Sequence, residues 1–225
     1  MVDSDSDDEL EQLQYKVIIL GDGAVGKTSI VNRFTENNFQ TSYKQTVGVD
    51  FFIKRIQLPG NIQVALQLWD IGGQQLGAPM LKKYIYGSHA VLLAYDITNY
   101  SSFKNLDQWY HFVREVFKSK IPFIGVIANK NDLNHLRNVK PDTHDNFCVM
   151  NDMQSFQMSA KTGDSVNTTF KRLAAELSGV TLSKKDIDME AKVLSAPIVD
   201  HPRTDAQNEK EKEEASNKKG KCVIQ

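Results

Sequence analysis

The glycine-rich stretch GDGAVGKT at residues 21–28 constrains the fold of this chain more than any other feature. It follows an apolar run, YKVIIL at 15–20, and precedes a helix-like segment at 28–37. Glycines allow backbone N–H groups to turn inward around a phosphate, and the N-terminus of a helix adds partial positive charge. The order of strand, glycine loop and helix therefore predicts a phosphate-binding loop of the form G-x4-G-K-T.

The last residues of this loop carry its predicted chemistry. Lys27 can reach the terminal phosphates of a nucleotide, and the Thr28 hydroxyl is placed to ligate Mg²⁺. The segment also fits the dinucleotide pattern G-x-G-x-x-G, but that pattern expects an acid about 20 residues on, where this chain has QTS at 40–42. The Lys-Thr pair also has no role in a dinucleotide-binding loop, so the phosphate loop is the better interpretation. Its candidate phosphate-binding residues are Gly21, Gly23, Ala24, Val25, Gly26, Lys27, Thr28 and Ser29.

The composition indicates one globular domain without membrane spans. The chain has 225 residues, 40% of them hydrophobic, which suffices for one domain with a full core. No apolar run approaches the ~20 residues of a membrane helix, and the acidic start is neither a secretory signal nor a myristoylation site. Two cysteines do not define a disulfide framework, so we expect a reducing, cytosolic compartment.

Charge is unevenly distributed along the chain. The formal net charge is −1, but residues 1–11 hold six acids and no base, which leaves +5 for the remainder. This charge is too small to indicate nucleic-acid binding, so we expect no nucleic-acid partner. We predict an acidic, disordered leader at 1–13, a nucleotide-binding domain at 14–178 and a flexible tail at 179–225.

Strand-like and helix-like segments alternate through residues 14–178. Two runs, 49–58 and 62–69, predict an antiparallel hairpin, because PGN between them forms a tight turn. Continuous apolar runs at 90–95 and 122–128 are typical of parallel strands covered on both faces. The pattern predicts an α/β fold: a mostly parallel, doubly wound, six-stranded sheet with one antiparallel strand and helices on both faces. The other expected segments are a strand at 155–158, a loop with at most a short helix at 71–86, and helices at 101–118, 141–150, 165–177 and 183–194.

Ligands of such sheets bind beyond the carboxyl ends of the strands, and Asp70 lies at one of these ends. It opens the pattern D-x-x-G. A carboxylate there can hold Mg²⁺, and Gly73 can offer its N–H to a terminal phosphate at a distance that a Cβ would forbid. An isolated Asp at a strand end is more often a turn former, but the upstream phosphate loop favours the metal role.

A second polar segment, NKND at 129–132, follows the predicted strand at 122–128. The ionised carboxylate of Asp132 only accepts hydrogen bonds, and guanine presents two donors side by side where adenine does not. Such a site predicts a preference for guanine on the order of 10^4. The stem of Lys130 can lie along the base, and the Ala160 N–H can reach guanine O6. The candidate base-binding residues are Asn129, Lys130, Asp132, Ser159, Ala160 and Lys161.

The set GDGAVGKT, Thr46, DIGGQ, NKND and SAK, in this order and spacing, resembles a small GTPase of the Ras superfamily. The resemblance covers about residues 15–177 and implies the phosphate-loop GTPase fold. TVGVDF and ALQLWD are similar to the segments that mark the Rab family. DFF at 50–52, LPGN at 58–61, WDIGGQ at 69–74 and KYIYG at 83–87 are together most similar to its outlying Rab twenty-eight branch.

The resemblance implies further roles and partners. Thr46 joins Thr28 as a Mg²⁺ ligand, Phe39 stacks near the base, Tyr43 covers the phosphates, and Gln74 positions the attacking water. For Phe39 and Tyr43, ordinary packing is the alternative. The implied protein is a monomeric GTP/GDP switch with Mg²⁺, which slowly hydrolyses GTP to GDP and phosphate in vesicle or ciliary trafficking. Its two loops, at about 39–48 and 71–82, order around the γ-phosphate. An exchange factor, a GTPase-activating protein and effectors of the GTP state are the implied partners.

The second of these loops departs from the family pattern. Family members usually have D-T-A-G-Q-E where this chain has DIGGQQ at 70–75. Gly72 frees a backbone position that normally carries alanine, and Gln75 removes an acid from the surface that exchange factors use. These changes leave open a GTP-locked binding module with negligible hydrolysis. A phosphate-loop ATPase or kinase is a third class, and Asp132 argues against it.

The residues CVIQ at 222–225 fit a prenylation box in which the last Gln favours farnesyl. Cys222 is the candidate lipidation site, and Lys218, Lys219 and Lys221 beside it support a membrane anchor. We therefore expect peripheral, lipid-anchored attachment to the cytoplasmic face of a membrane, with the plasma membrane and the ciliary base as candidates. A cytosolic pool held by a prenyl-binding carrier is expected as well.

Overall fold

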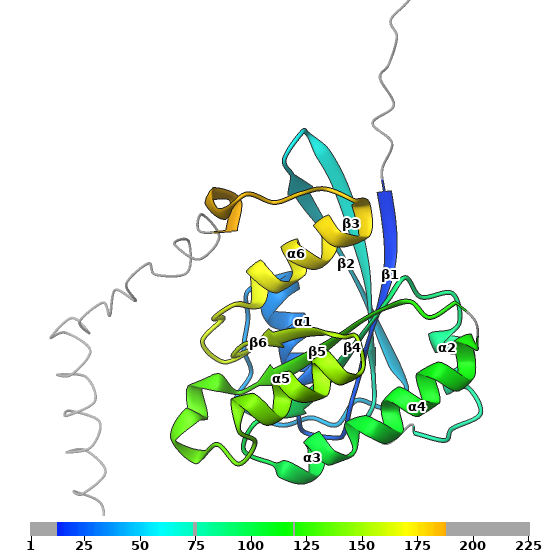
Figure 1. Cartoon of the computed structure of the whole chain (residues 1–225), viewed down its shortest axis with the longest axis vertical. Helices are drawn as coiled ribbons and strands as arrows, with labels where there is room; N and C mark the ends of the chain where they lie inside the picture. Colours follow the sequence, from blue (N-terminus) through cyan, green and yellow to red (C-terminus); the bar gives the residue numbers. More distant parts are fainter. Residues whose placement is uncertain (1–12, 74–75, 119, 188–225) are drawn as a thin grey trace, which may run out of the picture. The chain divides into compact units, whose positions relative to one another are not determined.

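The computed structural model describes residues 13–73, 76–118 and 120–187. Its centre is a six-stranded sheet in the order β2-β3-β1-β4-β5-β6 (Figure 1). β2 runs antiparallel to β3, and every other neighbouring pair is parallel, which confirms the predicted fold class. The strands are β1 (Leu13–Leu20), β2 (Val49–Leu58), β3 (Ile62–Ile71), β4 (Ala90–Asp96), β5 (Phe123–Asn129) and β6 (Gln154–Gln157).

Helices cover both faces of the sheet (Figure 1). On one face, α1 and α6 pack with Val17 and Ile19 of β1, and on the other face α2, α3, α4 and α5 pack with Ile18 and Leu20. Because successive residues of a strand point to opposite faces, β1 needs apolar side chains at every one of these positions. The helices are α1 (Lys27–Glu36), α2 (Leu81–Ile85), α3 (Tyr100–Lys104), α4 (Leu106–Phe117), α5 (Pro141–Met150), α6 (Val166–Ser178) and a 3-10 helix, η1 (Asn131–Leu136).

The predicted hairpin brings two distant segments to one edge of the sheet. In its register Val49 lies opposite Ile71 and Leu58 opposite Ile62. The turn residues Gly60 and Asn61 have φ of 80° and 60°, and such a turn matches the right-handed twist of the strands. Since β2 begins where β3 ends, the segment that precedes β2 lies beside the residues that follow β3.

The segment predicted as helical at 101–118 is helical, but the structure divides it into two helices, α3 and α4, at Asn105. The Asn99 side chain starts α3 by accepting from the Ser101 N–H at 3.0 Å. Asparagine favours helix ends over helix interiors because its side chain finds other partners, and Asn105 donates to the Asp22 carboxylate at 2.7 Å. The break therefore ties this helical segment to the glycine-rich loop.

The chain continues along the domain after α6. Val180 and Leu182 pack against the cluster under α1 and α6, and a helical turn follows at 184–187. The Ser183 N–H and hydroxyl donate to Asp186 Oδ2 at 2.8 and 2.6 Å, and this pair caps the start of the turn. Residues 1–12 and 188–225 lie outside the described residues, and these include the remainder of the predicted 183–194 helix and Cys222. Within the described ranges, no helix has both the length and the apolar character of a membrane span.

Candidate functional site

The glycine-rich loop joins β1 to α1 and holds a buried lysine. Lys27 Nζ donates to the backbone carbonyls of Gly21 and Asp22, both at 2.8 Å. Burial lowers the pKa of Lys27 to about 8, while the carboxylates of Asp70 and Asp22 act in the opposite direction. The lysine is thus held within the loop by two backbone carbonyls, where its ammonium could also contact phosphate oxygens.

The spacing of two loop glycines follows from what they touch. A Cβ at Gly21 would overlap the Ala94 carbonyl of β4, and a Cβ at Gly26 would overlap the Asn129 side chain at the end of β5. Both residues also have positive φ, 137° and 96°. Any other residue at either position would push the loop away from the sheet edge, so the G-x4-G pattern fixes where the loop lies.

The three predicted metal ligands meet on one side of this loop. Thr28 Oγ1 donates to Asp70 Oδ2 at 2.5 Å and lies 2.9 Å from Thr46 Oγ1, while Thr46 Oγ1 lies 3.4 Å from the same carboxylate oxygen. Asp70 is fully buried, burial raises its pKa, and its Oδ1 has no hydrogen-bond partner among the described residues. A buried carboxylate with a spare oxygen and two hydroxyls fits a hard, oxygen-seeking cation such as Mg²⁺.

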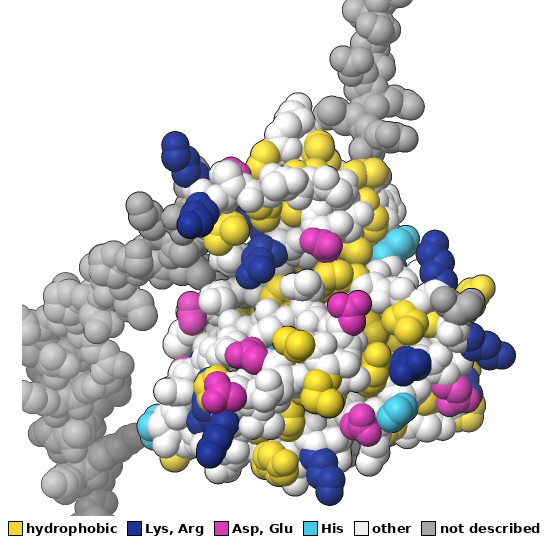
Figure 2. All heavy atoms as spheres, in the orientation of Figure 1, with side chains coloured by type: hydrophobic (Ala, Val, Ile, Leu, Met, Phe, Trp, Pro, Cys, Tyr) yellow, Lys and Arg dark blue, Asp and Glu magenta, His cyan; other side chains and the backbone are white. Residues whose placement is uncertain are grey.

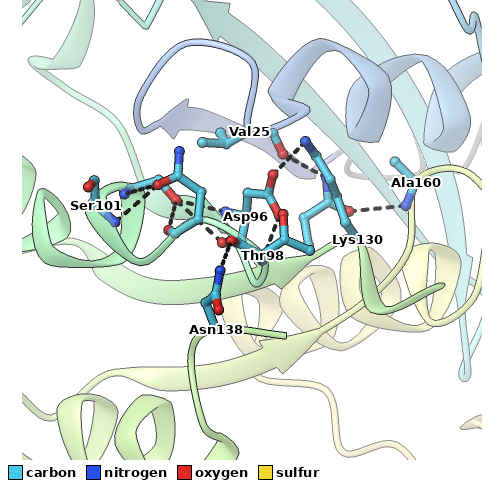
Figure 3. Close-up of polar contacts among 10 residues, drawn as sticks. Val25, Asp96, Thr98, Ser101, Lys130, Asn138 and Ala160 are labelled. Carbon is cyan, nitrogen blue, oxygen red and sulfur yellow. Dashed lines mark hydrogen bonds and ion pairs between the residues drawn. The ribbon is translucent and has the colours of Figure 1, made fainter. Parts of the chain in front are cut away.

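The predicted base-binding segments are joined to the phosphate loop through Asn129. Its Nδ2 donates to the Val25 carbonyl at 2.9 Å, and its Oδ1 accepts from the Ala160 N–H at 3.1 Å. Figure 3 shows Val25 and Ala160 on either side of this contact. Asn129 is fully buried and links three separate segments, so its role in this structure is to hold the pocket together.

The carboxylate predicted to recognise guanine is itself held in place. Asp132 Oδ1 accepts from Ser159 Oγ at 2.6 Å, and Lys161 Nζ lies 4.0 Å from Oδ2. The Thr162 N–H donates to Ser159 Oγ at 3.2 Å, which orients that hydroxyl toward Asp132. One carboxylate oxygen thus accepts a hydrogen bond from Ser159, the other lies near the Lys161 ammonium, and Asp132 lines a pocket.

Two residues that the sequence interpretation missed support this pocket. Lys130 Nζ pairs with Asp96 Oδ2 at 2.6 Å, and Figure 3 shows the two side chains pointing toward each other. Asp96 ends β4, so the strand-end argument that found Asp70 applied to it as well. Arg33 of α1 donates from Nε to the Ala160 carbonyl at 2.9 Å and from Nη2 to the Lys161 carbonyl at 2.6 Å. The sequence carries no signal for that contact.

A pocket of about 680 Å³ connects these groups. Phe39 and Tyr43 line it, as predicted from the resemblance, although Phe39 also packs against the core and Tyr43 is 67% exposed. Gly73 lies against the phosphate loop, where a Cβ would overlap the backbone of Asp22 and Gly23. Gln74 lies outside the described residues. The pocket is lined by these predicted residues: Gly23, Ala24, Gly26, Lys27, Thr28, Ser29, Phe39, Tyr43, Thr46, Gly73, Asn129, Lys130, Asp132, Ala160 and Lys161.

The fold and these contacts define a phosphate-loop nucleotide-binding domain. A family model described as the Ras family matches residues 16–179. The chain is 38% identical over 224 residues to Ras-related protein Rab-28 of Caenorhabditis elegans, which covers 99% of this chain and 90% of that protein. It is 34% identical to Ras-related protein YPTC6 of Chlamydomonas reinhardtii, over 82% of this chain and 83% of that protein. Ras-related protein Rab-11C of Dictyostelium discoideum is 36% identical, over 80% and 79%.

The chain therefore belongs to the Ras family of small GTPases. The predicted likeness to the Rab twenty-eight branch is confirmed by the relative with 38% identity over nearly the whole chain. As a member of this family, the protein binds guanine nucleotides with Mg²⁺ and hydrolyses GTP. Exchange factors, GTPase-activating proteins and effectors are the partners that the family implies.

Proposed function

We propose that the protein is a GTP-controlled switch that recruits effectors to membranes in vesicle or ciliary trafficking. The observation that carries the proposal is the meeting of two loops at Asp70. Thr46 comes from the first switch loop (39–48), Asp70 of β3 directly precedes the second (71–82), and their side chains lie 3.4 Å apart. A ligand held at this point acts on both loops at once, which is what a nucleotide switch requires.

In the proposed site, Thr28, Thr46 and Asp70 hold Mg²⁺, and Lys27 and the loop amides bind the phosphates. Mg²⁺ would neutralise the charge that develops between the β- and γ-phosphates. Lys27 is already positioned by two carbonyls, so its charge is in place before a phosphate binds. Asp132 would accept from the two guanine donors, with Ser159 and Lys161 fixing its orientation.

Hydrolysis in this proposal depends on Gln74, which would orient the attacking water. Among the described residues that line the pocket there are lysines but no arginine. Arginine supplied by a partner accelerates this class of reaction by 10³–10⁵. We therefore propose slow hydrolysis by the protein alone and a GTPase-activating partner that supplies the missing charge.

An aromatic surface beside both switch loops is the proposed contact for effectors. It consists of Phe51, Trp69 and Tyr84. The ring centroid of Trp69 lies 5.4 Å from that of Phe51 and 6.4 Å from that of Tyr84. Phe51 is 49% exposed, and Lys16 Nζ lies 4.4 Å from the Trp69 ring centroid. Aromatic groups of this kind dominate protein interfaces, and both loops flank this one. Figure 2 shows hydrophobic and basic side chains side by side on the surface around α2.

Membrane attachment is the part of the proposal that rests on the sequence alone. We propose Cys222 as the lipidation site and a prenyl-binding carrier as the cytosolic partner. A single prenyl chain anchors a protein only marginally, and the neighbouring lysines add roughly 1 kcal/mol each on an anionic surface. The protein would therefore exchange between the cytosol and the cytoplasmic face of a membrane.

Hydrogen exchange in two nucleotide states tests the switch. The full chain is compared with GDP and with a non-hydrolysable GTP analogue, both with Mg²⁺. Amides at 39–48 and 71–82 should exchange more slowly in the triphosphate state, while β5 and α6 serve as internal controls and should not change. Equal exchange of both loops in the two states would overturn the proposal of a switch without affecting nucleotide binding.

A further inference from the structure

Gly72 lies where the two switch loops touch. Its N–H donates to the Gly48 carbonyl at 3.1 Å, which continues the β2–β3 ladder beyond the last paired residues, Val49 and Ile71. A Cβ on Gly72 would lie 2.5 Å from the Thr46 carbonyl oxygen. That oxygen belongs to the backbone, so it cannot rotate out of the way as the end of a side chain could.

The close approach of the Thr46 carbonyl to the second loop depends on Gly72, a position at which the chain departs from the family pattern. The family pattern has alanine where this chain has Gly72, and alanine carries the Cβ that the contact excludes. The first switch loop can therefore pack directly on the backbone of the second. In that position Thr46 directs its hydroxyl at Thr28 Oγ1, 2.9 Å away, and at Asp70 Oδ2, 3.4 Å away.

We propose that Gly72 is a positioning residue for the metal site, which acts by admitting the Thr46 carbonyl so that the Thr46 hydroxyl reaches Mg²⁺. This inference rests on the proposed role of Thr46 as a metal ligand. Gly72 would not touch the metal itself but would orient Thr46, which is the ligand. Loss of contacts that orient a metal ligand typically weakens metal binding 10- to 100-fold. The alanine that is ordinary for the family would be harmful in this chain.

Release of a fluorescent, non-hydrolysable GTP analogue, measured against free Mg²⁺, tests this inference. Gly72→Ala should raise the Mg²⁺ concentration for half-maximal retention about tenfold, because its Cβ displaces the Thr46 carbonyl. Gly60→Ala is the matched control: it adds the same methyl at the far end of the same hairpin, where the nearest atom lies 3.9 Å away. Gly60 has a φ of 80°, so this control strains the backbone without touching the site. An unchanged Mg²⁺ requirement in Gly72→Ala would overturn the inference.

Thr46→Ala separates this inference from the proposed metal site. It should raise the Mg²⁺ requirement by itself, and adding Gly72→Ala to it should cause no further rise, because residues that act through one another are not additive. If Thr46→Ala has no effect, the proposed metal ligand is wrong. If Thr46→Ala has its effect but Gly72→Ala adds the same factor in both backgrounds, Gly72 does not act through Thr46 and the inference alone fails.

A measurement on the unaltered chain keeps the inference testable if Gly72→Ala does not fold. The Gly72 N–H is bonded to the Gly48 carbonyl, so it should be protected from hydrogen exchange with Mg²⁺ and the GTP analogue bound. Removal of Mg²⁺ should release this protection, since the metal holds Thr46 in place. A Gly72 amide that exchanges freely in the Mg²⁺-bound state would contradict the proposed contact.

Discussion

At the scale of single residues, the electrostatics of the phosphate loop centre on Lys27. Burial lowers its pKa to about 8, and its Nζ is held by two carbonyls. A phosphate beside it adds negative charge, which favours the ammonium form and raises the pKa again. Nucleotide binding is therefore linked to protonation of Lys27 near pH 8.

The affinity for GDP should fall as the pH rises through the pKa that Lys27 has in the nucleotide-free protein. Below pH 8 Lys27 is already charged, whereas above it binding must take up a proton, so the dissociation constant should rise about tenfold between pH 7 and 9. Titration with a fluorescent GDP analogue at fixed free Mg²⁺ measures this slope. In Lys27→Arg the guanidinium does not titrate, and the slope should flatten whatever the absolute affinity. The same slope in both proteins would assign the proton to another group.

Asp132 carries the predicted choice of base. Asp132→Asn replaces an acceptor by an amide that also donates, so affinity for GDP should fall about 10- to 100-fold. Affinity for xanthosine diphosphate should rise, because xanthine has an oxygen where guanine has its amino group. Asp142→Asn, the same change at an exposed position at the start of α5, should alter neither. Competition between the two nucleotides gives the ratio of their affinities. If Asp132→Asn leaves this ratio unchanged, Asp132 does not contact the base.

Site residues that lie in sequence motifs could be predicted. Residues that contact the site from distant parts of the sequence could not. Lys27, Thr28 and Asp132 lie in short patterns whose chemistry is local, and the structure lines one pocket with them. Arg33 contacts the Ala160 carbonyl across 127 positions of sequence, through backbone atoms that any residue would offer. No pattern of residue types records such a contact, so it emerges only when the chain is folded.

At the scale of elements, α1 contributes more than the N-terminus that faces the phosphates. Its Arg33 fork binds the carbonyls of Ala160 and Lys161 in the loop after β6. Another donor of the same side chain reaches the carbonyl of Asn37, the left-handed residue that ends the helix, at 3.1 Å. One guanidinium thus joins the end of α1 to the base-binding loop and ties the two sides of the pocket together.

Arg33→Lys should loosen that loop. A lysine has a single ammonium in place of the planar fork, so one of the two carbonyls loses its partner and nucleotide release should quicken by roughly tenfold. GDP and a GTP analogue should be affected equally, since the loop faces the base and not the γ-phosphate. Arg172→Lys, an exposed position on α6, is the matched control and should release nucleotide at the normal rate. An effect on the GTP analogue alone would place Arg33 in the phosphate site instead.

The element boundaries show the same division between local and distant causes. The hairpin turn at Gly60 was predictable because its chemistry is contained in four consecutive residues. The break at Asn105 was not, and the partner of the Asn105 side chain, the Asp22 carboxylate, lies 83 positions away. Trp109 also donates to Asp22, from Nε1 at 3.0 Å, so the helix that follows the break is aligned by the phosphate loop itself.

At the scale of the whole molecule, the sheet separates two apolar clusters, one under α1 and α6 and one under α2 to α5. The presence of one apolar cluster on each face of the sheet could be predicted from the continuous apolar strands. The polar groups buried next to these clusters could not be predicted. His144 of α5 is fully buried, and its Nε2 lies 2.8 Å from Ser155 Oγ, while its Nδ1 has no partner among the described residues. The Tyr95 ring and Cys148 Sγ lie next to it, at 5.6 and 3.8 Å.

Burial lowers the pKa of His144, assisted by the charge of Arg137 and opposed by that of Asp145. The native state therefore keeps the imidazole neutral at a pH where the unfolded chain has begun to bind a proton. Since the unfolded state binds more protons below its pKa of about 6.5, the free energy of unfolding should fall with the pH there, by up to about 1.4 kcal/mol per pH unit. Stability from this source is complete above that pH.

Urea unfolding at pH 7.5, 6.5 and 5.5 measures this loss, with GDP and Mg²⁺ at fixed excess because bound ligand also stabilises the native state. His144→Gln should be less stable at pH 7.5, because the fit around the imidazole is disturbed, but should lose less stability on acidification than the unaltered protein. His111→Gln, a change at a side chain that is 68% exposed, should keep the full pH dependence. The decisive quantity is the difference between the two variants in the slope of unfolding free energy against pH. Equal slopes would mean that groups other than His144 set the acid sensitivity of the fold.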